Sequence, residues 1–578
     1  MKKTTLTILL FMSATVLLAQ RTKTVTLRLI ETSDVHGAFF PYNFIERSPM
    51  RGTLARASTY INKQRRLYGK NLILMDNGDI LQGQPTCYYS NYVNPKMPNV
   101  AAEVINYLKY DAQVFGNHDV ETGHAVYDKW IHELQCPTLG ANIIDTKSGK
   151  PYVEPYLMLE RDGVRIAILG MLTPAIPNWL HQQLWSGMRF EEMVACARKW
   201  VKVLREKEQA DIIVGLFHSG WDGGIVTDEY DEDATKKVAE QVPGFDVIFF
   251  GHDHIQHHIT TQNGTLCLDP SSNAVKVAQA TLKLKVRTDK TKGRKVEIIE
   301  KRGEIVDITG EEIDEAYINH FQPQIDSIRH FVDQQIGTFL TPMRSRDAFF
   351  GPASFTDYIH DLQLEHTGAD LSFNAPLQFN TEVKVGPVYM SDMFKLYRYE
   401  NQIYVLRMTG SEIRRHLEMS YDLWVNTMQS PDDHIMLLND AAKGDQQRFG
   451  FKNLTFNFDS ASGIDYEVDV TKPNGQKVRI LQFSDGRPFQ EDQWYRVAMN
   501  SYRGNGGGEL LVRGAGIPLD SLPSRILYMS ERDQRHYLTE KIRKEGNVNP
   551  QAHHNWRFVP EEWALPAIAR DRKFIFQE

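Results

Sequence analysis

Six short apolar runs in the first half of the chain constrain the fold more than any other feature. They lie at residues 27–30, 72–75, 112–115, 165–169, 211–214 and 247–250. Each is short enough for a buried strand, and strands that alternate with helices are typical of a layered α/β domain. Most of the runs are followed at once by Gly, Asp, Asn or His. Because ligands gather beyond the carboxyl ends of strands in α/β sheets, we expect a polar site there.

The polar residues at these strand ends have the chemistry of metal ligands. They fall into five groups, at 33–37, 76–79, 116–119, 217–220 and 251–254. The mixture of carboxylate, imidazole and amide side chains suits Zn, Mn, Fe or Ni, and does not suit a cage for Ca or Mg built from oxygen alone. One Asp-x-His or Gly-Asn-His-Asp segment is usually an ordinary turn. Five such segments in order, each at a strand end, predict a metal centre.

The ordered motifs D-x-H, G-D, G-N-H, H and G-H-x-H resemble those of the calcineurin-like metallophosphoesterases. Their context is similar to the secreted 5′-nucleotidase group, which includes 2′,3′-cyclic-nucleotide 2′-phosphodiesterase/3′-nucleotidases. Further matches lie at 51–56, 76–83 and 141–142. The resemblance extends over nearly the whole mature chain and is strongest before about residue 280.

The resemblance implies an α/β fold with two domains. A four-layer αββα metallophosphoesterase domain would occupy 20–308, and an α+β nucleotide-binding domain of the 5′-nucleotidase C-terminal type would occupy 339–578. Between them, residues 311–335 carry apolar side chains at spacings near three and four, which predicts an amphipathic linking helix within 309–338. A chain of 578 residues is also too long for a single core.

By motif position, the resemblance assigns seven metal ligands to two divalent ions. Asp34, His36 and His254 would hold one ion, Asn117, His218 and His252 the other, and Asp79 would bridge them. Two cations held ~3.5–4 Å apart clamp phosphate oxygens and lower the pKa of a bound water, so that hydroxide can attack phosphorus.

The same resemblance implies that His118 is catalytic and is not a ligand. It would donate to charge that develops on the phosphate or on the leaving oxygen. The family places a carboxylate or amide three residues later to orient this imidazole, and here that residue is Glu121. Glu121 is one methylene longer than the Asp of many 5′-nucleotidases, so Asp119 is an alternative partner.

The second domain is expected to select the substrate. Asn500 and Tyr502 precede three consecutive glycines that include Gly507 and Gly508, and glycine permits close approach of a planar ligand to the backbone. By resemblance, Phe456 and Tyr502 form an aromatic pair that sandwiches a base. The alternative is that both aromatic side chains fill the core.

Two departures from the 5′-nucleotidase pattern favour the cyclic phosphodiesterase/3′-nucleotidase branch. Residues 373–378 lack both the glycine pair and the Arg of the N-G-G-x-R motif, and Gly508 stands where an acidic residue often follows the last glycine pair. A 5′-nucleotidase or a nucleotide-sugar hydrolase with the same metal chemistry is the alternative. A non-catalytic nucleotide-binding protein is a remote one, because decay of the site would have removed some ligands.

The N-terminal residues indicate the compartment. A basic start, an apolar run from Leu6 to Leu18 and the small residue Ala19 predict a signal peptide at 1–19, and hence a periplasmic or secreted protein. The run is short for a membrane span of ~20 residues, so we expect no membrane span in the mature form.

The overall charge and the cysteines give weaker indications. The net charge of −7 gives no reason to expect a polymeric nucleic acid as partner. The four cysteines could form disulfides or remain buried thiols.

Overall fold

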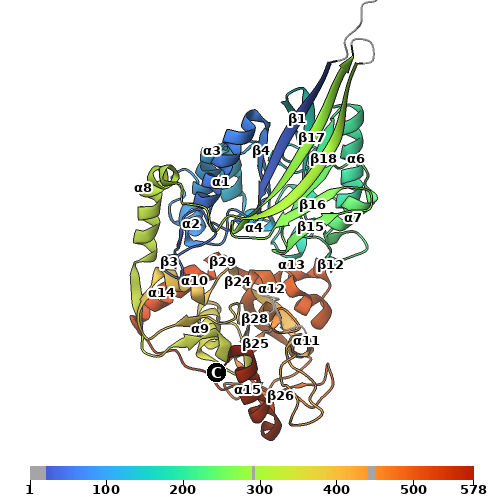
Figure 1. Cartoon of the computed structure of the whole chain (residues 1–578). Helices are drawn as coiled ribbons and strands as arrows, with labels where there is room; N and C mark the ends of the chain where they lie inside the picture. Colours follow the sequence, from blue (N-terminus) through green and yellow to red (C-terminus); the bar gives the residue numbers. More distant parts are fainter. Residues whose placement is uncertain (1–20, 290–292, 440–449, 578) are drawn as a thin grey trace, which may run out of the picture.

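The computed structural model describes residues 21–289, 293–439 and 450–577 (Figure 1). The predicted signal peptide at 1–19 lies outside these residues. Among the described helices, none has the length and apolar character needed to cross a membrane. All four cysteines are free thiols, and Cys87, Cys196 and Cys267 are buried.

Two six-stranded sheets form the centre of the N-terminal region, residues 21–307. The first has the strand order β18–β17–β1–β4–β5–β6 and the second β15–β16–β14–β11–β9–β8. The strands of the first sheet are β1 (Arg21–Thr32), β4 (Leu72–Asp76), β5 (Ala112–Val114), β6 (Thr138–Leu139), β17 (Lys276–Asp289) and β18 (Gly293–Asp307). Those of the second are β8 (Tyr156–Arg161), β9 (Val164–Leu172), β11 (Ile212–His218), β14 (Val247–Phe250), β15 (Gln256–Thr260) and β16 (Leu266–Pro270).

All six apolar runs of the sequence form strands of these sheets. The strands β1, β4 and β5 run parallel in one sheet, and β9, β11 and β14 run parallel in the other. Their carboxyl ends therefore meet along one edge of each sheet, as the polar residues after the runs predicted.

The two sheets pack face to face through a layer of buried apolar side chains. Leu27 and Leu29 of β1 belong to the same buried cluster as Val214 and Leu216 of β11. Helices α1 (Leu54–Tyr68), α3 (Val100–Leu108) and α5 (His124–Glu133) cover the outer face of the first sheet, and α6 (Met193–Glu206) and α7 (Thr235–Gln241) cover that of the second. This arrangement confirms the predicted four-layer αββα fold.

Helix α8 (Glu315–Val332) leads from the N-terminal region to the rest of the chain (Figure 1). Asp314 caps its first turn by accepting hydrogen bonds from two backbone amides. Its buried residues recur at spacings of three and four, beginning with Tyr317, Phe321 and Ile325. The buried residues lie on one face, so the helix is amphipathic.

The C-terminal region, residues 335–577, mixes sheets and helices, which confirms the predicted α+β character. Its largest sheet has the order β25–β21–β28–β24–β29. These strands are β21 (Leu371–Asn374), β24 (Gln402–Thr409), β25 (Ser460–Ser462), β28 (Trp494–Asn500) and β29 (Ile526–Asp533). The longer helices are α9 (Ser354–Thr367), α11 (Gly410–Trp424), α14 (Gln534–Glu545) and α15 (Glu561–Phe576).

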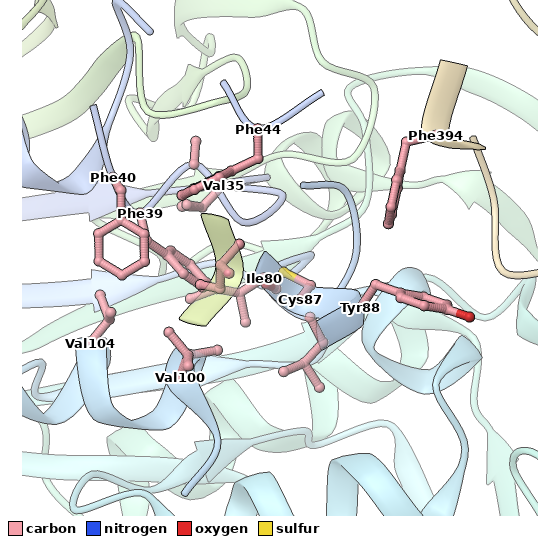
Figure 2. Close-up of a cluster of buried hydrophobic side chains, with 14 of the residues drawn as sticks. Val35, Phe39, Phe40, Phe44, Ile80, Cys87, Tyr88, Val100, Val104 and Phe394 are labelled. Carbon is pink, nitrogen blue, oxygen red and sulfur yellow. Dashed lines mark hydrogen bonds between the residues drawn. The ribbon is translucent and has the colours of Figure 1, made fainter. Parts of the chain in front are cut away.

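A buried cluster supports the loops that follow β1 and β4 (Figure 2). Val35 and Ile80 are adjacent in sequence to polar residues of the predicted site, and both side chains are buried in this cluster. The cluster extends to Tyr88 and to Phe394 of the C-terminal region, whose ring centroids lie 5.6 Å apart. The two regions of the chain therefore share apolar packing close to the predicted site.

Candidate metal centre

The backbone of the predicted ligands is unusual. Five of the seven have a left-handed backbone: Asp34 and His36 with φ of 49°, Asp79 with 53°, His254 with 58° and His252 with 88°. Non-glycine residues rarely adopt this conformation, and when they do they cluster at functional sites. The conformation turns the chain sharply after each strand, so that side chains from separate strands converge.

Asp34, His36 and His254 form the first group of side chains. Nε2 of His254 lies 3.3 Å from Oδ1 of Asp34 and 3.0 Å from Nε2 of His36. The ring of His36 is fixed from its other side, where Nδ1 lies 3.2 Å from the backbone oxygen of Gln82. Donation from Nδ1 leaves Nε2 of His36 facing the group with a lone pair.

Asn117, His218 and His252 form the second group. Oδ1 of Asn117 lies 3.1 Å from Nε2 of His218 and 2.8 Å from Nδ1 of His252. The opposite nitrogen of His218 lies 2.6 Å from the backbone oxygen of Asn77. His252 thus presents Nδ1 to the centre, whereas His218 and His36 present Nε2.

Asp79 lies between the two groups. Its Oδ2 is 3.9 Å from Nε2 of His36 in the first group and 3.4 Å from Nε2 of His218 in the second. Its Oδ1 accepts a hydrogen bond from the backbone amide of His118 at 2.9 Å. One carboxylate oxygen therefore faces both groups, which is the position required of a bridging ligand.

The chemistry of this donor set fits divalent cations. Ligand atoms of Asp34, His36, Asp79 and His254 all lie within 4.8 Å of one another. Burial, followed by repulsion from His254, lowers the pKa of His36 to about 3, so its ring is neutral and able to bind a metal. Two imidazole nitrogens that face each other at 3.0 Å beside two buried carboxylates are best satisfied by a cation between them.

The imidazole of His118 is hydrogen-bonded to Glu121 and not to Asp119. Nδ1 of His118 lies 2.6 Å from Oε2 of Glu121 within helix α4 (Asn117–Glu121). The carboxylate of Asp119 instead accepts hydrogen bonds from four backbone amides and is fully buried. Burial alone would lower the pKa of His118, but the carboxylates of Asp79 and Glu121 outweigh it and raise the pKa to about 9. Glu121 is therefore the partner of His118, and Asp119 holds the loops together.

The two aromatic side chains expected at the base site come together in the C-terminal region. The ring centroids of Phe456 and Tyr502 lie 6.0 Å apart, but the ring planes are at 89° and not parallel. Arg503 joins the two loops, because its guanidinium donates to Asp459 at 2.8 Å and to the backbone oxygen of Phe456 at 2.8 Å. The edge-to-face geometry means that one ring must turn before a base can lie between them.

The neighbours of this pair have structural roles that the sequence did not indicate. Oδ1 of Asn500 accepts from the backbone amide of Arg503 and caps helix α12 (Ser501–Gly504). A β-carbon at Gly507 would lie 2.6 Å from the ring of Tyr502, and one at Gly508 would collide with Asn457. The space beside these two glycines is therefore filled by side chains of the protein, Tyr502 and Asn457, whereas we expected a planar ligand to approach the backbone there.

Two further residues contact the proposed ligand His252 and were not predicted from the sequence. Oε1 of Glu232, on strand β13 (Asp231–Asp233), lies 3.1 Å from Nε2 of His252. The ring of Trp179 lies 5.7 Å from that of His252, and its backbone oxygen accepts from Asn505 at 3.4 Å. The only sequence feature near Glu232 is the acidic run 228–233, and Trp179 lies in no motif that indicates a functional site.

Comparison with protein families gives two matches that together span most of the chain. Residues 27–256 match the calcineurin-like phosphoesterase family, and residues 335–513 match the 5′-nucleotidase C-terminal domain. The first match contains every predicted metal ligand, and the second contains the aromatic pair.

Similar proteins agree with these matches. The chain is 27% identical to a 2′,3′-cyclic-nucleotide 2′-phosphodiesterase/3′-nucleotidase of Haemophilus influenzae over 93% of this chain and 88% of that protein. It is 26% identical to the trifunctional nucleotide phosphoesterase protein YfkN of Bacillus subtilis, but spans only 39% of that protein's length. A Staphylococcus aureus structure described as a 5′-nucleotidase has the same fold, with a TM-score of 0.76 at 21% identity over 92% of this chain and 99% of the other. The chain is a calcineurin-like phosphoesterase with a 5′-nucleotidase C-terminal domain, and it is therefore a phosphoric ester hydrolase.

Proposed function

We propose that this enzyme hydrolyses nucleotides at a centre of two divalent metal ions and prefers 2′,3′-cyclic nucleotides and 3′-nucleotides. The observation that carries the proposal is the position of Asp79, whose Oδ2 faces His36 in one ligand group and His218 in the other. The Haemophilus influenzae relative, similar along nearly its whole length, is named for this pair of activities.

The protein's own groups have distinct tasks in this proposal. Bound metal ions of the Zn, Mn, Fe or Ni class would polarise the phosphoryl group and make hydroxide available near neutral pH. His118 is held through Nδ1 by Glu121, so Nε2 is the atom that can donate a proton toward the leaving oxygen. The side chain of His118 is 25% exposed, which leaves it accessible to a substrate.

The nucleoside would bind against the C-terminal region. Asn505, three residues after Tyr502, donates to the backbone of Trp179, whose ring lies against His252. The loop of the aromatic pair thus adjoins a proposed metal ligand. A base between Phe456 and Tyr502 would place its attached phosphate near the metal centre.

The choice among nucleotides rests on sequence. Residues 373–378 lack the N-G-G-x-R motif that is typical of 5′-nucleotidases, and this favours the cyclic phosphodiesterase branch. A 5′-nucleotidase is the second candidate, because a 5′-nucleotidase of Vibrio cholerae is 28% identical over 34% of this chain.

A panel of substrates tests the proposal. The purified chain is supplied with Mn²⁺ or Zn²⁺ and offered 2′,3′-cyclic AMP, 3′-AMP and 5′-AMP, with Asp79→Asn as the control. We expect turnover of the first two, which the substitution abolishes. Preference for 5′-AMP would overturn the choice of branch but keep the metal chemistry. Absence of turnover on all three would overturn the nucleotide proposal.

We also propose that chemistry and substrate binding are divided between residues 20–308 and 339–578, joined by the segment 309–338. The position of helix α8 within that segment supports the division. Closure of the two parts would bring phosphate to the metals.

We further propose that the enzyme acts in the periplasm or outside the cell, because residues 1–19 have the composition of a signal peptide. The N-terminal sequence of the mature protein checks this, and retention of Met1 would contradict it.

A further inference from the structure

A segment of the C-terminal region, residues 397–401, contacts the pair His118–Glu121 of the N-terminal region. Nδ2 of Asn401 donates to Oε1 of Glu121 at 3.2 Å, while Oε2 of Glu121 lies 2.6 Å from Nδ1 of His118. The ring of Tyr399 lies parallel to that of His118, with centroids 6.3 Å apart and planes at 9°. Each oxygen of Glu121 therefore has one partner, and one of these partners comes from the other half of the chain.

The amide of Asn401 is itself fixed. Its Oδ1 accepts from the hydroxyl of Tyr397 at 3.2 Å, and its backbone oxygen accepts from the amide of Gln534 at 2.7 Å. The side chain of Asn401 is buried, and Tyr397 is fully buried. Because Oδ1 is occupied by a donor, the amide must direct Nδ2 toward Glu121.

A buried arginine holds the segment rigid. Arg535 donates to the backbone oxygens of Tyr397 at 3.0 Å and Arg398 at 2.7 Å, and to the carboxylate of Glu400 at 2.9 Å. It has no exposed surface, and its guanidinium lies 4.8 Å from the centre of the ring of Tyr88 in the N-terminal region. The residues that precede Asn401 are therefore anchored by a buried cation that also packs against the N-terminal region.

We propose that Asn401 is a positioning residue for the reaction, which acts through Glu121 to hold the imidazole of His118. The inference rests on the proposed function, because it needs His118 to act on the phosphate ester. A glutamate has one more rotatable bond than the aspartate of many 5′-nucleotidases, and the additional donor restricts that freedom. Glu121 has this second donor only while the C-terminal region is packed against it, so domain closure would couple substrate binding to chemistry.

A double-mutant cycle on kcat tests this inference. Asn401→Ala is made in the wild type and in His118→Ala, and both are assayed on whichever phosphate ester the wild type turns over. In the wild type we expect kcat to fall by about 10- to 100-fold, as for other groups that orient a functional side chain, with KM little changed. In the His118→Ala background we expect a change below about 2-fold, because the residue through which Asn401 acts is gone.

Lys395→Met is the matched control, because Lys395 also joins the two regions, through Glu46 at 3.2 Å, without touching the pair. It should leave kcat unchanged. If Asn401→Ala does not fold, Asn401→Asp keeps the shape, replaces the donor by an acceptor and should give the same pattern. Equal losses in both backgrounds, or no loss in the wild type, would overturn the role of Asn401. Inactivity of the metal-loaded wild type on every ester would instead overturn the proposed function, and with it this inference.

Discussion

Nε2 of His252 donates to Oε1 of Glu232 at 3.1 Å, so a carboxylate outside the ligand set orients one of the proposed ligands. The bond fixes the tautomer of His252 and leaves Nδ1, 2.8 Å from Asn117, as the nitrogen that faces the centre. The second oxygen of Glu232 accepts from the amide of Ile225 at 2.7 Å, so the carboxylate is itself held in place.

Loss of this carboxylate should weaken metal binding. We expect Glu232→Ala to lower the affinity for Mn²⁺ or Zn²⁺ by about 10- to 100-fold, because a histidine without its outer partner is a poorer and less oriented ligand. Isothermal titration of the metal-free protein measures this. Glu229→Gln is the control, because Glu229 is exposed and lies just before strand β13, which carries Glu232. Equal affinity in Glu232→Ala and the control would show that Glu232 does not support the ligand.

The ring of Tyr502 should contribute to nucleotide binding and not to the chemical step. We expect Tyr502→Ala to raise KM for nucleotides by about 5- to 150-fold, which corresponds to the ~1–3 kcal/mol of stacking on one base. Hydrolysis of bis(p-nitrophenyl) phosphate, which has no base, should change little in the same variant. An equal loss on both substrates would contradict a role in base stacking.

The buried His360 predicts a pH dependence of stability that is separate from the metal centre. Burial lowers the pKa of His360 from 6.5 to about 3, and its Nδ1 lies 2.6 Å from the hydroxyl of Ser372. Below about pH 6.5 the unfolded chain binds a proton that the folded protein does not. As the pH is lowered below about 6.5, the free energy of unfolding therefore decreases by about 1.4 kcal/mol per pH unit, until the pH approaches the pKa of His360 in the folded protein.

Replacement of His360 should remove this dependence. In His360→Gln we expect the free energy of unfolding to depend less steeply on pH between about pH 6 and pH 4. The slope should decrease by up to about 1.4 kcal/mol per pH unit, which corresponds to one bound proton. Urea unfolding followed by fluorescence at several pH values gives the slope. The exposed His132 provides the control variant, His132→Gln. An unchanged slope in His360→Gln would contradict the burial of a neutral imidazole.

The sequence predicted those features that depend on neighbouring residues. Asp34, Asp79 and His218 lie at or just beyond the ends of buried strands, and both the strand and the polar residue could be recognised locally. Parallel pairing then places these ends along common sheet edges, so convergence followed from fold class alone. The left-handed backbone of Asp34 and His36 was not predictable, because non-glycine residues seldom adopt it.

Contacts between distant segments could not be predicted. Glu232 is 20 residues from His252, and Asn401 is 280 residues from Glu121, so no local pattern joins either pair. Gly508 shows a different difficulty: a glycine signals close approach but does not say of what. In the structure its neighbours are the side chains of Asn457 and Arg503.

If Asp79 bridges two metal ions, electron paramagnetic resonance of the Mn²⁺-loaded protein will detect the pair. Two ions ~3.5–4 Å apart are magnetically coupled, whereas a single ion is not. We expect two coupled ions per wild-type chain, and loss of both the coupling and the hydrolysis of phosphate esters in Asp79→Asn. The control Asp128→Asn, at an exposed aspartate of α5, should behave as the wild type. Full activity with one uncoupled ion, or an Asp79→Asn variant with undiminished coupling and turnover, would contradict the bridging position of Asp79.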